Sequence, residues 1–478
     1  MLKLLSRLFQ PHQATTKVVP LAVRGKYDAA QTTEDNRRHW AMADGLSAAA
    51  ANSRSVRRTI RNRARYEVAN NSYAKGIIAT LANDVVGRGP ILQVAAGAAE
   101  ANTRIERAFS NWAIEIGLAQ KLRTMRQSKA IDGEAFAMLV TNEALRSPIK
   151  LDLKLIEAEQ VTDPDDSQNH ADGIRFDQFG NPASYTVLRE HPGSGTTSTE
   201  KLSPVPAENM IHWFGVDRPG QVRGIPDITP ALPLFAQLRR FTLAVLAAAE
   251  TAASFAAVLY TTAPANGEAD DVDPFLPIEI EQRMMTTVPA GWQMGQLRPE
   301  QPCSTYAEFK RELINEIARC LNMPFNVAAC NSASYNYASG RLDHQVYFKS
   351  IRVEQDALEA IVLSKIFQAW LDEASLVPGL LPAGPYGDWA SDRQWFWDGA
   401  EHVDPTKEAS AQETRLRNHT TTLAEEYARQ GKDWEQQLRQ RARELELMQQ
   451  LNLSPETPSQ ATQPSNDTED ATTDQAAA

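Results

Sequence analysis

The longest helix pattern in the chain limits its possible folds more than any other feature of the sequence. Thr229 and Pro230 provide an N-cap and a proline at the first helical position, and the pattern then runs to about Tyr260. At 1.5 Å per residue such a helix is about 45 Å long, which is unusual for the core of a compact enzyme. Its second half, AVLAAAETAASFAAVL, consists mainly of small residues, which let neighbouring helices approach closely. The pattern therefore predicts a rod packed among other rods. The candidate packing positions are the alanines Ala248, Ala252 and Ala256.

A second helix follows after a turn-rich connection. Thr305 and Glu308 match a capping box, and the helix pattern stops before Pro324. Its apolar positions, spaced for burial on one face, are Phe309, Leu313 and Ile317. The connection, residues 261–303, contains an acidic loop formed by Glu268, Asp270, Asp271 and Asp273. Because loops bear partner surfaces more often than helices do, this loop is a candidate contact with another protein. A solvated loop without a partner is the alternative.

The first half of the chain has the pattern of an α+β domain. Residues 1–50 are polar, Ala-rich and poorly periodic, and we expect them to form an extended arm. One helix pattern begins at Arg54 and stops at Gly87, and a second spans roughly Asn102 to Arg126. Four strand patterns bounded by turn sequences follow, at residues 135–140, 151–156, 183–188 and 209–214. The fold class expected for the whole chain is α+β, predominantly helical.

A run of arginines marks the start of the first helix pattern. The run consists of Arg54, Arg57, Arg58, Arg61, Arg63 and Arg65. We expect a solvated or subunit-pairing face here, because charge runs usually face water, and DNA contact is the alternative. Either use would keep these side chains at the surface.

An uncharged polar loop lies between two helix patterns in the second half of the chain. The segment NVAACNSASYNYASG, residues 326–340, carries no charge, and a long amphipathic helix resumes at Arg341. Arg341, Lys349 and Arg352 fall at helical spacing and form one stripe on that helix. Such a stripe could steer a DNA duplex, although salt bridges between subunits are the favoured alternative.

The C-terminal part is rich in charged helix formers and ends in a polar tail. A Trp-rich segment leads into a helical stretch from Thr406 to about Leu451, which Gly431 is expected to break in two. The composition of the remaining residues is typical of disorder.

The sequence carries none of the common signatures of an enzyme or a metal site. It lacks the phosphate-binding GxxxxGK[ST] motif as well as HExxH, GxSxG and the dinucleotide-binding GxGxxG pattern. The three cysteines show no CxxC spacing, which argues against a disulfide scaffold and a zinc site. His212, Asp132 and Glu134 are expected to be structural, because nothing forms a set of nucleophile, base and orienting group. We therefore expect no catalytic residue, no cofactor and no bound metal.

Hydropathy and charge limit where the protein acts. No apolar run reaches the roughly 20 residues of a bilayer-spanning helix, and the N-terminal MLKLLSRLFQPHQ lacks a signal-peptide pattern. An intracellular soluble protein is therefore expected. The net charge of −11 is not that of a protein that grips nucleic acid, because that affinity comes from clustered Lys and Arg. A protein that lets DNA slide would tolerate this charge, as would most cytoplasmic proteins.

Five segments, taken in chain order, carry a family resemblance. They are RARYEVANNSYAKGIIATLANDVVGRG (63–89), DGEAFAML (132–139), IHWFGVDRPGQVRGIP (211–226), FKRELINEIARCLNMPFNVAACNSASYNYASGR (309–341) and WFWDGAEHVDPTKEASA (395–411). Together they span about residues 50–450 and resemble the lambda-like family of tailed-bacteriophage portal proteins, the head-tail connectors. The chain departs from the family pattern at Cys330–Asn331, where a Gly-Asp-like pair is expected.

The resemblance implies a portal fold of wing, two-helix stem, clip and crown, assembled as a ring with a central channel. Its implied parts are an N-terminal arm (1–50), the wing (51–226 and 341–405), two stem helices (227–260 and 304–325), the clip (261–303), a tunnel loop (326–340), the crown (406–450) and a disordered acidic tail (451–478). The tunnel loop and the following helix would supply the DNA-channel residues Ser332, Ser334, Tyr335, Asn336, Tyr337, Arg341, Lys349 and Arg352. The acidic loop would lie in the clip and face the packaging motor.

The implied function is the passage of double-stranded DNA at one capsid vertex, first during packaging and later during ejection. The implied partners are further copies of the chain, as a dodecamer in the particle, the terminase large subunit, the major capsid protein, and head-tail adaptor or head-completion proteins. Contact with DNA would be non-specific, and no membrane is involved. The protein is expected in the virion after assembly in the host cytoplasm. Two alternatives are another structural ring or scaffold protein of a phage head, and a helical enzyme of unrecognised type.

Overall fold

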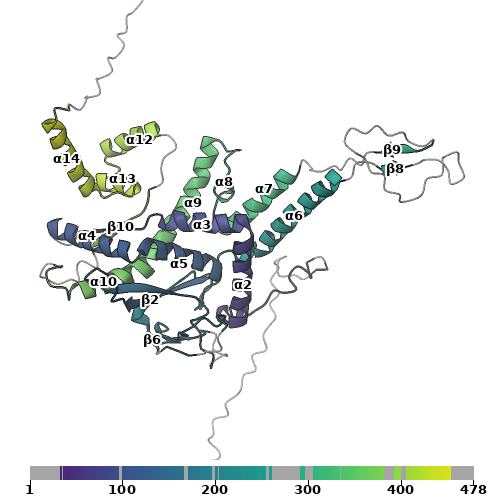
Figure 1. Cartoon of the computed structure of the whole chain (residues 1–478), viewed down its shortest axis with the longest axis horizontal. Coiled ribbons are helices and arrows are strands. Elements are labelled where there is room, and N and C mark those ends of the chain that lie inside the picture. The colour runs from purple at the N-terminus through teal and green to yellow at the C-terminus, as the bar shows by residue number, and fades with distance from the viewer. Residues whose placement is uncertain are drawn as a thin grey trace, which may run out of the picture. The chain divides into compact units, whose positions relative to one another are not determined.

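The computed structural model (Figure 1) describes most of the chain. The described residues are 33–34, 36–95, 99–165, 171–195, 200–202, 204–254, 258–260, 291–295, 305–333, 335–381, 392–399 and 405–453. The chain divides into two units, Met1–Ser47 and Ala48–Ala478. The described part of the first unit consists of turns and irregular chain. Every helix and strand among the described residues belongs to the second unit.

Three helices open the second unit: α1 (Ala48–Ala51), α2 (Arg54–Asn70) and α3 (Ser72–Val86). The sequence pattern predicted one helix across α2 and α3, but the backbone breaks at Asn71. This residue is extended, with a φ of −122°, and its side chain accepts hydrogen bonds from the first N–H groups of α3. The predicted stop at Gly87 is confirmed, because this residue ends α3 with a φ of 55°.

The next two helices, α4 (Ala99–Glu115) and α5 (Leu118–Asp132), replace the single helix predicted from Asn102 to Arg126. Gly117 separates them with a φ of 65°, a left-handed conformation that glycine adopts at little cost. Helix α5 packs against α3 on one side and against the central sheet on the other.

The central sheet is antiparallel, with β2 (Glu134–Thr141) between β3 (Leu151–Ile156) and β7 (Met210–Phe214). These strands confirm three of the four predicted strand segments to within one residue. Alternate side chains of β2 face different cores, because successive residues of a strand point to opposite faces. The described residues contain two clusters of buried apolar side chains, a larger one formed mainly by helices and a smaller one. Ala135 lies in the larger core and Phe136 in the smaller core.

A smaller antiparallel sheet contributes to the second core. It consists of β4 (Ile174–Phe176), β5 (Pro182–Tyr185) and β6 (Val205–Pro206), followed by the 3-10 turn η2 (Ala207–Asn209). The strand predicted at residues 183–188 is therefore shorter than expected. Its last two residues form only isolated bridges.

The larger core lies where the N-terminal helices, the central sheet and the C-terminal half of the chain meet. Phe109 of α4 is at its centre. Its ring centroid lies 5.2 Å from that of Trp112, 5.4 Å from Trp370, and 5.6 Å from both Phe367 and Trp395. Tilted and edge-on contacts of this kind add to the apolar area that the rings bury.

The long helix predicted from Thr229 to Tyr260 is shorter in the structure. A 3-10 turn, η3 (Thr229–Ala231), precedes α6 (Leu232–Ser254). Thr229 does not cap the helix, because its hydroxyl donates to a backbone oxygen of the preceding turn. The last predicted residues form strand β8 (Val258–Tyr260), which pairs with β9 (Gln293–Gly295).

Helix α6 is unusually exposed for its composition. The helical segment Thr229–Glu250 comprises η3 and most of α6. Among the described residues it is the helix that is long and apolar enough to cross a membrane, which the sequence pattern did not predict. Core helices of soluble proteins often pass the same test, but only 22% of the apolar window is buried here. Leu243 is 56% exposed and Leu246 is 54% exposed. The single chain therefore leaves this apolar face uncovered.

Helices dominate the chain after the β8–β9 pair. They are α7 (Tyr306–Arg319), α8 (Phe325–Ala328), α9 (Tyr337–Leu358), the π-helical turn η4 (Glu359–Leu363) and α10 (Ser364–Ala374). The last three form one continuous helical stretch. The segment predicted as a loop at residues 326–340 is helical at both ends, so the loop itself covers residues 329–336.

The start of α7 differs from its prediction in two ways. Thr305 occupies the N-cap position but makes no side-chain capping bond, so the predicted capping box is not formed. Leu313 and Ile317 are buried as predicted, whereas Phe309 is 54% exposed. Phe309 makes an edge-on contact with Phe241 of α6, with the ring centroids 4.9 Å apart.

The C-terminal elements return to the first half of the chain. They are β10 (Arg393–Phe396), which pairs with β1 (Ile91–Val94), and the helices α12 (Pro405–Arg417), α13 (Leu423–Arg429) and α14 (Trp434–Gln450). Gly431 separates α13 from α14, which confirms the predicted break. A further break, between α12 and α13, was not predicted.

Candidate functional site

A buried cluster of charges joins α2 to the central sheet. Glu134, the first residue of β2, lies at its centre. Arg223 Nη2 donates to Glu134 Oε1 over 2.7 Å, and Arg223 Nε donates to Oε2 over 2.9 Å. Arg61 of α2 pairs with the same carboxylate, and His212 Nε2 lies 3.0 Å from Oε2. All four side chains are at most 5% exposed. Because charges removed from water are costly unless they are paired, the cluster fixes the positions of the elements that contribute to it.

The arginine run of α2 therefore forms the predicted solvated face only in part, because Arg57 and Arg61 are buried. Arg57 Nη2 lies 2.7 Å from Asp172 Oδ2, and Arg57 and Arg61 are at most 3% exposed. The two arginines are four residues apart, so they share the face of α2 that is turned toward the sheet. Arg58 and Arg63, on the other side of the helix, are exposed.

The charge states of this cluster favour a structural role. Burial opposes the negative charge of Glu134, but Arg223 and Arg61 outweigh it and hold the pKa of this carboxyl well below its usual range. Burial lowers the pKa of His212, although Glu134 favours the protonated ring. Glu134 is thus a fixed anion at neutral pH and a poor proton acceptor. The prediction that Glu134 and His212 are structural agrees with this geometry.

Two glycines allow the backbone to close over the cluster. A Cβ atom on Gly224 would lie 1.9 Å from the backbone oxygen of Gly133. Gly224 N–H donates to Glu134 Oε2 over 3.1 Å. The sequence segments DGEAFAML and IHWFGVDRPGQVRGIP therefore meet here, and this contact explains why both contain glycine at these positions.

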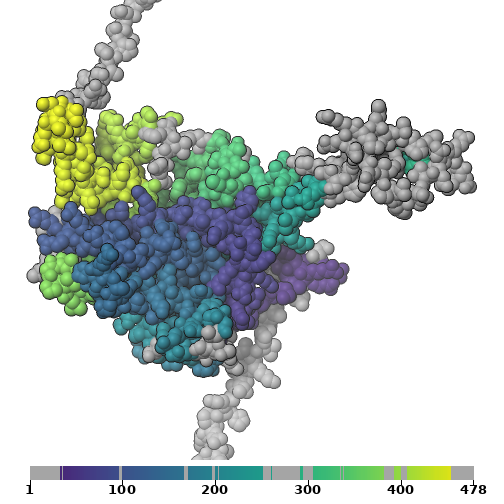
Figure 2. Space-filling view, viewed as in Figure 1, coloured from purple at the N-terminus to yellow at the C-terminus, as the bar shows by residue number. Residues whose placement is uncertain are grey.

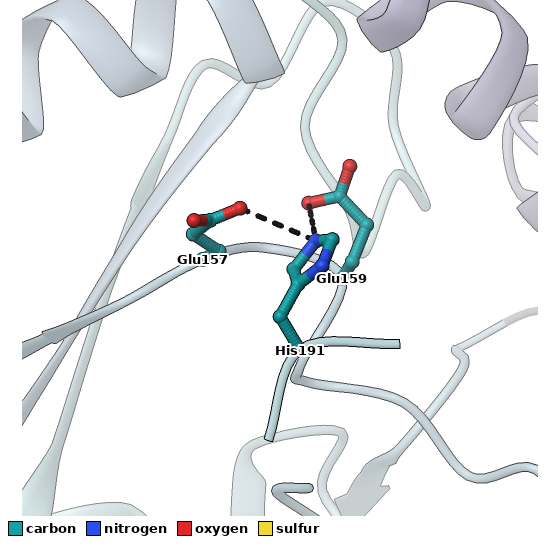
Figure 3. Close-up of side chains that lie close together, drawn as sticks. All are labelled: Glu157, Glu159 and His191. Atoms are coloured by element: carbon teal, nitrogen blue, oxygen red, sulfur yellow. Dashed lines mark ion pairs between the residues drawn. The ribbon is translucent and has the colours of Figure 1, made fainter. Parts of the chain in front are cut away.

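Glu157, Glu159 and His191 lie close enough together to be tested as a metal site (Figure 3). His191 Nε2 is 3.2 Å from Glu157 Oε2 and 3.8 Å from Glu159 Oε2. However, Gly193 N–H donates to His191 Nδ1 over 2.9 Å, so the proton of the neutral ring is on Nε2. A protonated nitrogen cannot bind a metal, and Arg65 Nη2 already pairs with Glu159 Oε2 at 2.9 Å. The arrangement favours ion pairs of Arg65 with Glu157 and Glu159 over a metal site.

A cleft of 570 Å³ lies between β1, α4, β10 and α14. Its lining includes Glu106 and Asp433 but no histidine, cysteine, serine or lysine, so it offers none of the usual nucleophile–base pairs. Val94 N–H donates to Glu106 Oε1 over 2.9 Å, and Gln93 Nε2 donates to Asp433 Oδ1 over 3.1 Å. The first bond attaches β1 to α4, and the second attaches β1 to the N-cap residue of α14.

The uncharged loop before α9 is held by its own polar side chains. Asn326 Nδ2 lies 2.8 Å from His344 Nε2, which links α8 to α9. Asn331 Oδ1 accepts a bond from the backbone N–H two residues further on. Asn336 caps α9 in a reciprocal capping box with Ser339, whose N–H donates to Asn336 Oδ1 over 2.8 Å. The loop is thus built without charged groups.

Cys330, where the family pattern has a glycine, lies in a backbone conformation that favours glycine. Its φ is 51°, in the left-handed region that favours glycine. A cysteine here has to tolerate a conformation that costs a residue with a Cβ roughly 1–2 kcal/mol. A glycine, which the family pattern has here, would adopt this conformation without that cost.

The predicted channel residues of this loop have different environments. Ser332 and Asn336 are exposed, and Tyr335 is half-buried. Ser334 and the side chain of Tyr337 lie outside the described residues. The helix-capping role of Asn336 was missed, although the pattern Asn-x-x-Ser before a helix could have indicated it.

The predicted basic stripe lies on an open face of α9. Arg341, Lys349 and Arg352 are all exposed. Figure 2 shows α9 in green and α6 in teal at the surface of the molecule. Next to the stripe, exposed apolar side chains follow the same helix: Leu342, Val346 and Val353.

The candidate stem-packing alanines and the acidic loop lie only partly among the described residues. Ala248 of α6 is half-buried. Ala256 and the side chain of Ala252 lie outside the described residues. The acidic loop with Glu268, Asp270, Asp271 and Asp273 also lies outside them.

Comparisons with known proteins agree on one family. The model of the family described as "Phage portal protein, lambda family" matches residues 35–355. A protein of Halomonas phage phiHAP-1, named "Probable portal protein", is 24% identical over 426 residues, which cover 83% of this chain and 81% of the relative.

Two solved structures are similar to this chain at low sequence identity. One is the neck of an empty gene transfer agent particle with C6 symmetry, with 13% identity and a TM-score of 0.42, covering 73% of this chain and 86% of that one. Another is an HK97 family phage portal protein from Corynebacterium diphtheriae, with 14% identity and a TM-score of 0.31, covering 65% of this chain and 89% of that one.

Proposed function

Because the chain belongs to the lambda family of phage portal proteins, we propose that its copies form the ring at one capsid vertex through which double-stranded DNA is packaged and ejected. The family match over residues 35–355 carries this proposal, since it includes the central sheet, α6, α7 and the loop before α9. A portal protein is a structural component, so we assign no catalytic activity to the chain.

The uncovered apolar surface supports an assembly of several copies. Leu243 and Leu246 on α6 and Val346 and Val353 on α9 are each more than half exposed in the single chain. Large exposed apolar side chains that line up on helices mark protein contacts more often than free surface. A contact between two different faces of the same chain repeats from copy to copy and can close into a ring.

The family parts can be assigned to the observed elements. Helices α6 and α7 would form the stem, since they pack through Phe241, whose ring centroid lies 5.5 Å from that of Tyr306. The central sheet with α2 to α5 and α10 would form the wing, and α12 to α14 the crown. Residues 261–303 would be the clip, and residues 329–336 the tunnel loop.

The composition of the tunnel loop suits a surface that DNA slides past. Fixed Lys or Arg contacts in every copy would add up around a ring to strong, salt-dependent binding of the duplex. The exposed Ser332 and the half-buried Tyr335 offer bulk and weak, exchangeable hydrogen bonds instead. We therefore propose residues 329–336, the loop itself, as the DNA-channel surface.

The partners of the ring follow from the same assignment. The acidic clip residues Glu268, Asp270, Asp271 and Asp273 would meet the terminase motor during packaging and a head-tail adaptor or head-completion protein afterwards. The wing would contact the major capsid protein. Assembly would take place in the host cytoplasm, as a dodecamer in the particle.

Electron microscopy of the purified chain tests the proposal directly. Negative-stain images should show rings with an open central hole. Shells, filaments or closed particles would instead indicate another structural protein of the phage head. Compact particles of one or two copies at every concentration would contradict a portal role.

A further inference from the structure

Helix α9 carries a face that combines positive charge with exposed apolar side chains. The cations are Arg341, Lys349 and Arg352. The apolar side chains are Leu342, Val346 and Val353, each more than 60% exposed. Among the described residues no ion pair involves these cations, and Arg352 bonds to a backbone oxygen of its own helix. This face, which we call the basic α9 face, would fit a surface that is both acidic and partly apolar.

Helix α7 carries a face with the opposite properties. Glu308, Glu312 and Glu316 follow each other at intervals of four residues and are all exposed. Phe309 lies beside this row and is 54% exposed. In the described part of the chain no ion pair involves these glutamates. The row is visible in the sequence as E-x-x-x-E-x-x-x-E, and we call it the acidic α7 face.

The order of charges also matches between the two faces. The acidic row is followed by the exposed Arg319, and the basic row by the exposed Asp356. Glu312 and Arg319 are seven residues apart, as are Lys349 and Asp356, a distance of about 10 Å along a helix. If the two helices lie side by side and parallel with Glu312 opposite Lys349, then Arg319 lies opposite Asp356. Both pairs then combine charges of opposite sign.

We propose that the acidic α7 face of one copy docks on the basic α9 face of the next copy around the ring. This inference rests on the proposed ring and assigns one of its contacts. The two faces belong to different helices, so the contact joins different surfaces of identical chains, as a closed ring requires. DNA is the competing occupant of the basic face. A phosphate backbone would leave the three apolar side chains of α9 uncovered, whereas α7 offers Phe309 next to its carboxylates.

Charge reversal on each face, alone and together, tests this contact. One variant carries Glu308→Lys, Glu312→Lys and Glu316→Lys; a second carries Arg341→Glu, Lys349→Glu and Arg352→Glu; a third carries all six changes. Ring formation is measured by sedimentation and negative-stain microscopy over a range of protein concentrations. Each variant changed on one face should need at least a tenfold higher protein concentration to assemble half of its chains into rings. The variant with all six changes should reach half-assembly near the parental concentration. Circular dichroism checks that each variant is folded.

A matched control reverses three exposed cations elsewhere. The variant Arg439→Glu, Arg441→Glu and Arg443→Glu changes the net charge by the same amount on α14, and it should assemble like the parent. Carbodiimide cross-linking of mixed ¹⁴N and ¹⁵N copies gives a second measurement, because it joins a carboxylate directly to an amine. Peptides from α7 linked to Lys349 should carry mixed isotopes.

The outcomes separate this contact from the ring itself. Rings that form equally well in the parent and in both single-face variants would overturn the α7–α9 contact and leave the portal role intact. Normal rings of the α9 variant combined with a loss of DNA packaging would overturn it in favour of DNA. If the parent chain forms no rings at all, the proposed function fails, and the contact fails with it.

Discussion

At the scale of single residues, Glu134 holds together parts of the chain that are far apart in sequence. It binds Arg61 across 73 positions and Arg223 across 89 positions. Arg61 belongs to α2 and Arg223 to the segment before α6. One carboxylate therefore joins both of them to β2, the middle strand of the central sheet. A buried charge that loses its partner is far more costly than an exposed one, because water cannot replace the missing contact.

Replacing Glu134 with Gln should therefore destabilise the chain strongly. The variant leaves two buried guanidinium groups without a counter-charge, and the free energy of unfolding should fall by about 3–5 kcal/mol. Denaturant unfolding followed by tryptophan fluorescence measures it. Glu413→Gln is the control, because its ion pair with Arg417 is largely exposed and should contribute at most about 1 kcal/mol. Equal losses in the two variants would contradict the role assigned to Glu134.

His212 in the same cluster predicts a pH dependence with a definite sign. Burial lowers the pKa of His212 in the folded chain below the ordinary value of 6.5. Below pH 6.5 the unfolded chain binds a proton that the folded chain does not, so stability falls as the pH falls through that window. The melting temperature of His212→Gln should decrease less than that of the parent between pH 7 and pH 5. Parallel curves for the two proteins would show that His212 does not titrate as inferred.

The arginine run shows what the sequence could not predict at this scale. The spacing of Arg57 and Arg61 places them on one face of α2, but it does not reveal what that face contacts. Their burial depends on Glu134 and Asp172, which reach the helix only through the tertiary fold. Charge runs usually face water, which is correct for Arg58 and Arg63 and wrong for Arg57 and Arg61. His212 was assigned correctly because it lies within a strongly apolar strand.

At the scale of elements, strands were easier to predict than the breaks between helices. The β2, β3 and β7 segments are short apolar or alternating runs between clear turn signals, and their bounds agree with the prediction to within one residue. An isolated glycine within a helical pattern costs only about 1 kcal/mol, so Gly117 did not predict a break. Asn71 was equally ambiguous, because asparagine can be tolerated within a helix or cap the next one.

The cap of α9 gives a prediction at the element scale. Asn336→Ala removes the side chain that accepts the Ser339 N–H bond, and it should cost about 1 kcal/mol in the first turn of the helix. Hydrogen exchange of the amides of residues 338–340 should become about fivefold faster, as expected for that free energy. Asn336→Asp keeps the acceptor and serves as the control, with nearly parental exchange. Unchanged exchange in the Ala variant would mean that the cap does not limit opening of this turn.

At the scale of the whole molecule, the capping role of Asn336 determines which residues of the loop can be used to test contact with DNA. A lysine at Asn336 would disturb α9 and add charge at the same time, so its effect could not be assigned to DNA contact. Ser332 and Ala333 are both exposed, and neither side chain makes a described hydrogen bond. The clip and the ring itself could be expected only from the family resemblance, because a local sequence pattern can indicate a contact face but not which surface covers it.

The variant Ser332→Lys with Ala333→Lys should form normal rings but package DNA more slowly than the parent. Two added cations in each copy multiply around the ring into a band of positive charge that holds the duplex. Because this attraction comes from counterion release, the slowing should be greatest at low salt and fade as salt rises. Packaging assays at several salt concentrations measure it. The control Ser332→Gln with Ala333→Gln adds bulk without charge and should show no salt-dependent slowing. If the Lys variant packages at the parental rate at every salt concentration, residues 329–336 do not face the DNA, and the channel lining must be sought on another element.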